Sequence, residues 1–111
     1  DLGRTLDRLT KNKVINLIGK TKLGEVIDVI SLCQSFLSND SGLMHVAASL
    51  NIKQVAIFGS SDPKKTPPLS RHAKLAYLDL SCSPCFERIC PLQHTNCLKN
   101  IKPSEIIKKL I

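Results

Sequence analysis

The sequence predicts an α/β domain built on a parallel sheet. Short apolar runs, several of them closed by glycine, alternate along the chain with segments whose apolar residues recur at helical spacing. The apolar runs are nearly continuous, which is typical of strands buried on both faces between two layers of helices. We therefore expect a Rossmann-like parallel sheet with flanking helices, formed by residues 1–111 as a single domain.

The first half of the chain contains two strand–helix units. Residues 14–19, VINLIG, form an apolar run closed by glycine and are predicted to be a strand. Residues 23–33 show apolar side chains at helical spacing, and residues 35–38 predict a second strand. Residues 42–50 predict a helix that ends near Asn51. The first 13 residues read as the second half of a helix that runs into a loop, so we expect a fragment of a longer protein.

The second half begins with the clearest strand. Residues 53–59, KQVAIFG, are β-branched and apolar and stop at glycine. Residues 60–72 contain three prolines and are predicted to be a loop. Residues 73–80 predict a further strand, and residues 79–99 a cysteine-rich loop. Residues 102–111 predict a final helix, because Pro103 or Ser104 marks a start and lysines lie near its end.

Charge restricts the possible partners. The formal net charge is +7, from 16 Lys and Arg against 9 Asp and Glu. This favours an anionic partner, such as a nucleotide, a phosphosugar or a membrane surface, or else it only keeps the surface soluble. Four aromatic residues are too few for base-stacking platforms, so we expect no nucleic acid. No apolar run approaches the roughly 18–20 residues of a membrane span.

The junction between the strand at 35–38 and the helix at 42–50 is a candidate binding site. In open α/β sheets, ligands bind beyond the carboxyl ends of strands, where the next helix begins. Gly42 lets a ligand approach the backbone, and free N–H groups of a first helical turn favour an anion. Ser41 and His45 lie one turn apart and could donate to a phosphate, whereas Asp40 suits sugar hydroxyls. A helix cap, a turn glycine and a packed histidine would give the same pattern.

The stretch SNDSGLMHVAASLNIKQVAIFGSSDPKKTPPLS closely resembles the bacterial ADP-heptose:lipopolysaccharide heptosyltransferases, glycosyltransferase family 9. That family shows a D-[ST]-G-L-x-H-x-A-A pattern, a strand ending in glycine and a [ST]-[DS]-P…T-x-P loop. The matching residues here are Asp40, Ser41, Gly42, Leu43, His45, Ala47, Ala48, Gly59, Ser61, Asp62, Pro63, Thr66 and Pro68. The resemblance runs from about residue 14 to the C-terminus.

The resemblance implies a GT-B glycosyltransferase, of which this chain is most of the C-terminal, nucleotide-sugar-binding lobe. It implies inverting transfer of heptose from ADP-heptose to a lipid A–Kdo–heptose acceptor, without a cofactor, at the cytoplasmic face of the inner membrane. The catalytic base is expected in an N-terminal lobe outside these residues, so the chain alone should be inactive. A non-catalytic nucleotide- or phosphosugar-binding module and a metal-stabilised interaction domain are the alternatives.

The resemblance also implies roles for particular residues. Asp40 is expected near the heptose, and Ser41, Gly42 and His45 around the diphosphate. Thr21 is expected beside the adenine and ribose. The hydroxyls in residues 60–66 could approach the sugar or acceptor, although a plain proline-rich loop fits equally well.

Four of the five cysteines lie close together in the sequence. Cys82, Cys85, Cys90 and Cys97 follow a C-x2-C-x4-C-x6-C spacing, with His94 between the last two. Four thiolates suit structural zinc, and iron–sulfur clusters are also held by a similar number of cysteines. Reduced thiols and two disulfides are the other interpretations, although a cytoplasmic protein disfavours disulfides. Cys33 stands alone in a helical pattern and is predicted to be a small core residue.

Overall fold

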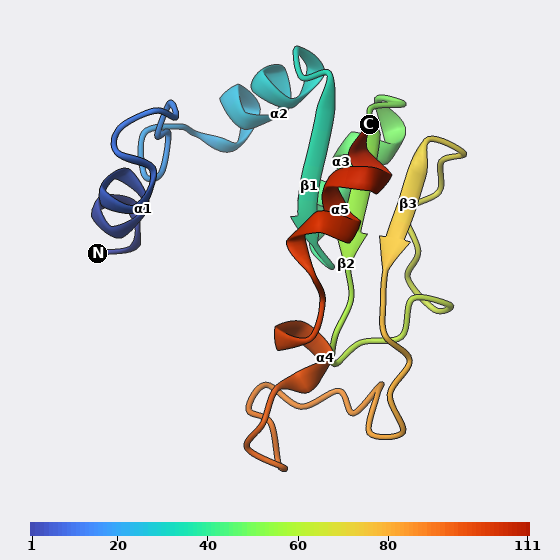
Figure 1. Cartoon of the computed structure of the whole chain (residues 1–111). Helices are drawn as coiled ribbons and strands as arrows, with labels where there is room; N and C mark the ends of the chain where they lie inside the picture. Colours follow the sequence, from blue (N-terminus) through green and yellow to red (C-terminus); the bar gives the residue numbers. More distant parts are fainter.

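A computed structural model describes all residues, 1–111, and shows a three-stranded parallel sheet. The strands are β1 (Ser35–Asn39), β2 (Lys53–Ile57) and β3 (Ala73–Ala76), and they lie in the order β1-β2-β3 (Figure 1). Leu37 pairs with Val55 in one ladder, and Val55 pairs with Lys74 in the other. The predicted parallel sheet is therefore confirmed.

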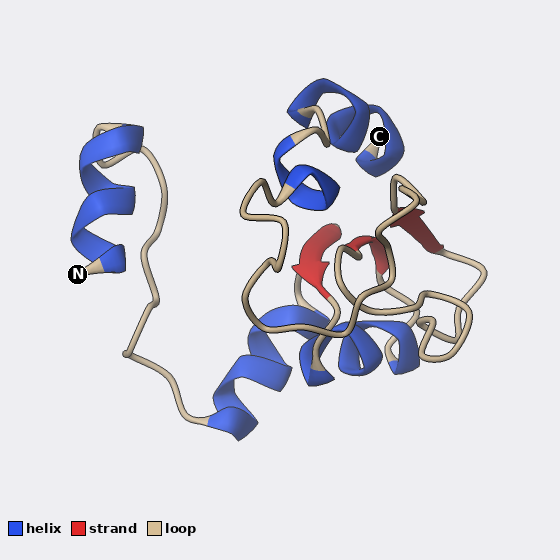
Figure 2. Cartoon of the chain, turned by 90° about the horizontal axis from the view of Figure 1, so that it is seen from below, coloured by secondary structure: helices blue, strands red, loops and turns tan.

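Helices cover both faces of this sheet (Figure 2). The helices of the chain are α1 (Leu2–Thr10), α2 (Leu23–Ser31), α3 (Gly42–Ser49), α4 (Asn96–Lys99) and α5 (Pro103–Leu110), and α3 and α5 make the main contacts with the strands. On one face, Met44 of α3 packs with Ala56 and Phe58. On the other face, Ile106 of α5 packs with Val55 and Ala76. The central strand β2 is thus buried from both sides, as its continuous apolar sequence predicts.

Local signals explain the ends of these helices. Asn51, directly after the cap of α3, takes a left-handed φ of 57°, which ends the helix as its sequence predicts. Pro103 is the first residue of α5, where its missing N–H costs nothing. Glu105 lies in the first turn of α5 and two lysines in the last, which suits the helix dipole.

The strand predicted at residues 14–19 is wrong, because this segment pairs with no strand. Instead it turns back on α1. The Asn16 amide donates to the carbonyl of Gly3 at 2.9 Å, and the Ile18 N–H donates to the Asn16 side chain at 3.0 Å. A strand needs a neighbour to satisfy its backbone groups, and no strand adjoins the outer edge of β1.

Two further boundaries differ from the prediction. The strand expected at residues 73–80 stops at Ala76, because its partner β2 stops at Ile57, the residue that pairs with Ala76. The cysteine-rich loop contains the short helix α4, which the sequence did not predict.

No helix has both the length and the apolar character needed to cross a membrane.

The chain exposes more surface than a compact monomer of its mass. Its accessible surface is 8292 Å², whereas a 12.2 kDa monomer typically exposes about 6,000 Å². Part of the excess comes from α1, which lies apart from the sheet (Figures 1 and 2). Only 14 of 111 residues are buried, so most of the stability must come from the two small clusters on β2.

Candidate functional site

A hollow of about 160 Å³ lies at the carboxyl edge of the sheet. We call it the carboxyl-edge hollow, and it is lined by Asn39, Asp40, Ile57, Gly59, Ser60, Ser61 and Leu98. Asp40 follows β1, and the two serines follow β2. Parallel strands end at the same edge, so the topology brings these two segments together. The Asp40 N–H donates to the carbonyl of Ile57 at 3.1 Å and fixes the first segment to the second.

Helix α3 begins beside this hollow. Ser41 is its N-cap residue, with extended backbone, and its side chain makes no capping hydrogen bond. Gly42 is the first helical residue, and a Cβ added there would meet no atom within 4 Å. The N–H groups of a first helical turn lack partners inside the helix. This end of α3 can therefore receive an anion that approaches the open backbone of Gly42.

The structure places the predicted binding residues at three separate positions. Asp40, Ser41 and Gly42 lie together at the carboxyl edge of the sheet. His45 lies one turn further along α3 with an exposed side chain and does not line the hollow. Thr21, which precedes α2, lines a different hollow of about 180 Å³ whose lining is mainly apolar. Phe36 of β1 and Leu43 of α3 line that second hollow too, so β1 and α3 connect the two hollows.

The cysteine segment, residues 79–99, forms another wall of the carboxyl-edge hollow. The Phe86 N–H donates to the carbonyl of Ser60 at 2.7 Å. The ammonium of Lys65 lies 5.2 Å from the centre of the Phe86 ring, within cation–π range. Leu98, from α4, lines the hollow itself. The sequence did not indicate Leu98 as a site residue. The one local signal was Gly59 after β2, since a residue without a side chain lets another segment come close.

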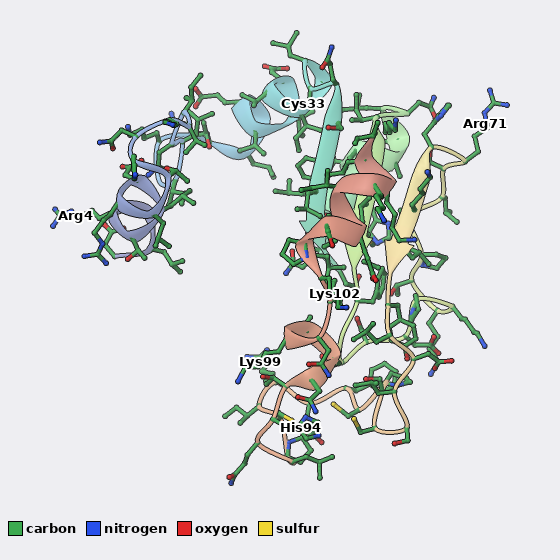
Figure 3. The ribbon with its side chains drawn as sticks, viewed as in Figure 1. Arg4, Cys33, Arg71, His94, Lys99 and Lys102 are labelled. Carbon is green, nitrogen blue, oxygen red and sulfur yellow. The ribbon has the colours of Figure 1, made fainter.

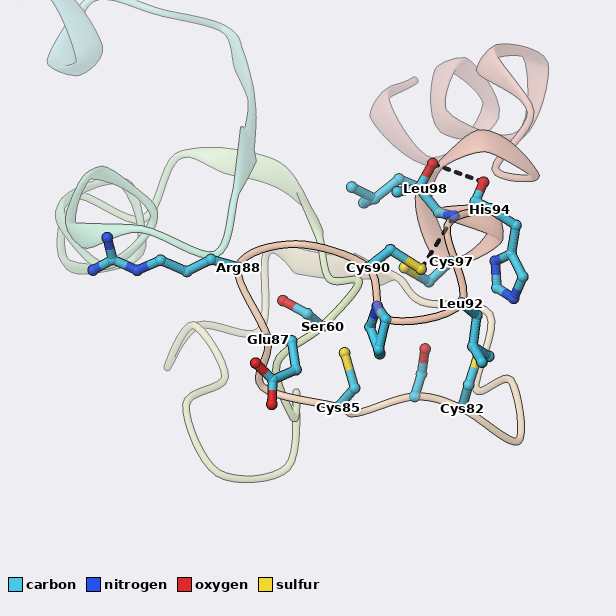
Figure 4. A pocket seen from close by; sticks show the side chains of 13 residues that line it. Ser60, Cys82, Cys85, Glu87, Arg88, Cys90, Leu92, His94, Cys97 and Leu98 are labelled. Atoms are coloured by element: carbon cyan, nitrogen blue, oxygen red, sulfur yellow. Dashed lines mark hydrogen bonds between the residues drawn. The ribbon is translucent and has the colours of Figure 1, made fainter.

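The four clustered cysteines line one cavity of about 100 Å³ (Figure 4). All of them are free thiols, and each is half-buried. The N–H of Thr95 donates to the Cys90 sulfur at 3.4 Å, and this bond lowers the pKa of the Cys90 thiol below its ordinary value. No three Cys, His, Asp or Glu side chains are already arranged so that they could hold a metal ion. Metal binding here stays a prediction.

Cys33 is separate from this cluster. Figure 3 shows it just past α2, far from His94 in the cysteine segment. Its thiol donates to the carbonyl of Val29 at 3.4 Å, and it lines the same apolar hollow as Thr21. This fits the predicted packing role, although Cys33 is only half-buried.

Comparison with known proteins gives consistent matches. The family model for glycosyltransferase family 9 (heptosyltransferase) matches residues 3–96. Lipooligosaccharide heptosyltransferase 2 of Campylobacter jejuni is 42% identical over 99 residues, which are 88% of this chain and 31% of that protein. Lipopolysaccharide heptosyltransferase 2 of Escherichia coli is 49% identical over 63 residues, 57% of this chain and 18% of that protein.

A solved structure agrees with these sequences. The E. coli ADP-heptose lps heptosyltransferase II superposes with a TM-score of 0.69 at 37% identity, over 86% of this chain and 26% of that chain. The chain thus spans less than a third of the length of these relatives. The predicted likeness to a GT-B lobe is confirmed at the level of the fold.

Proposed function

The chain belongs to glycosyltransferase family 9, and we propose that it forms the ADP-heptose-binding part of a heptosyltransferase. The observation that carries the proposal is the carboxyl-edge hollow, where Asp40 meets Ser60 and Ser61 beside the open first turn of α3. The hydroxyls of a sugar need carboxylate and hydroxyl partners, and a diphosphate needs N–H donors. A sugar diphosphate therefore needs the two kinds of group side by side. Family membership favours this function over a non-catalytic binding module or an interaction domain.

The diphosphate binds at the start of α3 in this proposal. Its charge is matched by the N–H groups of Gly42 and Leu43, and His45 donates from one turn further along the helix. An acceptor hydroxyl attacks the anomeric carbon of the heptose and gives its proton to the base expected in the N-terminal lobe, while ADP leaves with the electrons of the broken bond. Because negative charge grows on the diphosphate as the bond breaks, fixed N–H donors stabilise the transition state without a metal.

The sugar and the nucleoside lie on either side of the diphosphate. The Asp40 carboxylate would repel a phosphate, so it accepts hydrogen bonds from heptose hydroxyls within the carboxyl-edge hollow. Ser60 and Ser61 line the same hollow and offer donors to the sugar. Thr21 contacts the adenosine, because the apolar hollow that it lines borders Leu43 and could accept a flat base.

The acceptor and the location follow from the same proposal. The acceptor is a lipid A–Kdo–heptose molecule, and transfer takes place at the cytoplasmic face of the inner membrane through peripheral contact. The net charge of +7 supports this, since both the donor and the phosphorylated lipid surface are anionic.

A chimera tests the proposal. The matching segment of the C. jejuni relative is replaced by this chain, and heptose transfer from ADP-heptose is measured together with ADP binding. We expect transfer, and we expect His45→Ala to lower kcat/KM about tenfold or more, as for loss of one charge-assisted hydrogen bond worth ~1.5–3 kcal/mol. The control is His72→Ala, an exposed histidine just before β3, at the opposite edge of the sheet.

Asp40→Asn distinguishes sugar binding from helix capping. The substitution should weaken ADP-heptose binding more than ADP binding, whereas the exposed Asp28→Asn on α2 should change neither. Equal losses for both ligands would assign Asp40 to capping α3. A folded chimera that neither binds ADP nor transfers heptose would refute the proposal as a whole.

A further inference from the structure

The cysteine segment reaches the carboxyl-edge hollow without a core of its own. Residues 77–95 contain no helix or strand. Its large apolar side chains Phe86, Ile89 and Leu92 are 59%, 85% and 57% exposed, so they supply little packing. Yet the Phe86 N–H donates to Ser60 at 2.7 Å, which requires the loop to be held at a defined place. Besides this bond, the Lys65–Phe86 contact and the approach of Cys97 and Leu98 to Gly59 hold the loop, and a cross-link among its cysteines would add to these few contacts.

We propose that Cys82, Cys85, Cys90 and Cys97 bind one thiophilic divalent cation of the zinc type, and that this ion holds the cysteine segment against the wall of the hollow. All four sulfur-bearing side chains come from different parts of the loop and line a single cavity of about 100 Å³ (Figure 4). Four thiolates around one ion give the closed tetrahedral site of structural zinc. Metal binding by these cysteines does not depend on which sugar or nucleotide the hollow binds.

Four thiolates fit better than three thiolates and a histidine. The Nδ1 atom of His94 accepts a hydrogen bond from the Asn96 N–H at 3.0 Å. This nitrogen is therefore already engaged by the backbone, which leaves the four thiols as the better ligand set. His94 instead fixes the backbone just before Cys97. It is a positioning residue in this proposal.

The sulfur of Cys90 is already held in place by the loop backbone. The Thr95 N–H donates a hydrogen bond to it at 3.4 Å. When the ion binds, four S–H protons pass to solvent, four sulfur–metal bonds form, and no electron is transferred. Since thiolate–zinc bonds are about 2.3 Å long and no three donors yet form a metal site, binding draws the four thiols together and tightens the loop.

The site is connected directly to the carboxyl-edge hollow. The Cys97 sulfur would lie 3.2 Å from a Cβ placed on Gly59, so the ligand packs against the end of β2. The next residue, Leu98, lines the hollow. An ion bound to Cys97 therefore fixes the start of α4, and with it the position of Leu98 in the hollow.

Cobalt titration tests the proposal. The 111-residue chain is purified with a reductant and titrated with Co²⁺ alone, which reports tetrahedral thiolate ligation by its charge-transfer and visible bands. We expect about one cobalt per chain, displaced by one zinc. Serine at any of the four cysteines should weaken cobalt binding by about a hundredfold or more. Even the loss of a residue that only hydrogen-bonds to a metal ligand lowers metal affinity by about 10–100-fold.

Two matched variants serve as controls. Cys33→Ser removes the cysteine outside the cluster and should leave cobalt binding unchanged. His94→Gln keeps an acceptor for the Asn96 N–H and should retain the four-thiolate spectrum. Circular dichroism of each variant shows whether the sheet is folded, and hydrogen exchange at the Phe86 and Thr95 N–H groups should slow when zinc is added.

Several results would overturn the proposal. A folded chain with four titratable cluster thiols and no cobalt bands would leave the segment as an ordinary loop. Oxidised cluster cysteines in the freshly purified protein would indicate disulfides, and bound iron with acid-labile sulfide would indicate a cluster. Loss of binding in His94→Gln, together with a three-thiolate spectrum in the unsubstituted protein, would refute the ligand set.

Discussion

Replacing Gly59 by alanine should loosen the junction between β2 and α4. The added Cβ would lie 2.8 Å from Cδ2 of Leu98, 3.0 Å from its Cγ and 3.2 Å from the Cys97 sulfur. Carbon atoms pack best at about 3.5–4.0 Å, so Leu98 must move by roughly 1 Å. Because Leu98 is 50% exposed, it can rotate outward and leave the carboxyl-edge hollow.

The size of the effect follows from two opposing contributions. Overpacking of this kind costs about 1–3 kcal/mol. Alanine also restricts the unfolded chain, which offsets about 0.4–1 kcal/mol. We therefore expect Gly59→Ala to lower the free energy of unfolding by about 0.5–2 kcal/mol. At about 4 °C per kcal/mol for a chain of this size, the Tm should fall by roughly 2–8 °C.

Urea unfolding of the reduced, metal-free chain measures this change. The control is Gly24→Ala in α2, where an added Cβ meets no atom within 4 Å, and it should be neutral or stabilising by about 1 kcal/mol at most. A double-mutant cycle with Leu98→Ala assigns the contact. The loss caused by Gly59→Ala should shrink by about 1 kcal/mol once Leu98 is truncated.

Either of two outcomes would refute this reasoning. One is a Gly59→Ala variant as stable as Gly24→Ala. The other is strict additivity with Leu98→Ala, since that would mean that the leucine does not touch the new methyl group. A changed m-value would show instead that the substitution alters how much surface unfolding exposes.

Three other predictions concern the core, the pH dependence and the activity of the chain. Gln54 is fully buried in β2, its amide donates to the Met44 carbonyl at 3.1 Å, and its Oε1 has no partner. Gln54→Met should therefore change the free energy of unfolding by less than about 1 kcal/mol, whereas Gln54→Ala should lose about 2–4 kcal/mol through its cavity; equal losses in urea would contradict this. Burial, with Asp79 and Asp62 nearby, raises the pKa of Tyr77 above 10.0. The folded state then keeps this proton where the unfolded state loses it, so stability should fall as the pH rises above about 10, and Tyr77→Phe should lessen that fall in pH-dependent melts. An unchanged pH profile in Tyr77→Phe would count against it. The 111-residue chain alone should transfer no heptose, because it matches only 31% of its C. jejuni relative; measured transfer to a lipid A–Kdo–heptose acceptor would overturn that expectation.

The sequence by itself determined the elements whose signals are local. Residues 53–57 are rich in apolar and β-branched side chains. Such a run is typical of a strand that helices cover on both faces, and it forms the central strand β2. The ends of the helices are marked by Gly42, by Asn51 with its left-handed backbone, and by Pro103. These residues act through their own backbone conformation, so no contact with a distant residue is needed. For Ser60 and Ser61 the sequence offered only hydroxyls that could approach the sugar or acceptor. The fold shows that they line one hollow with Asp40, because parallel strands share a carboxyl edge.

The tertiary structure decided what depends on a neighbour. Residues 14–19 have a strand-like composition, but a strand forms only beside another strand, and here Asn16 bonds to α1 instead. The spacing of the four cysteines suggested a cluster, yet only the folded loop shows that they line one cavity and that His94 is already hydrogen-bonded. The approach of Leu98 to Gly59 joins residues far apart in the sequence, and such contacts arise from packing, which no local pattern records.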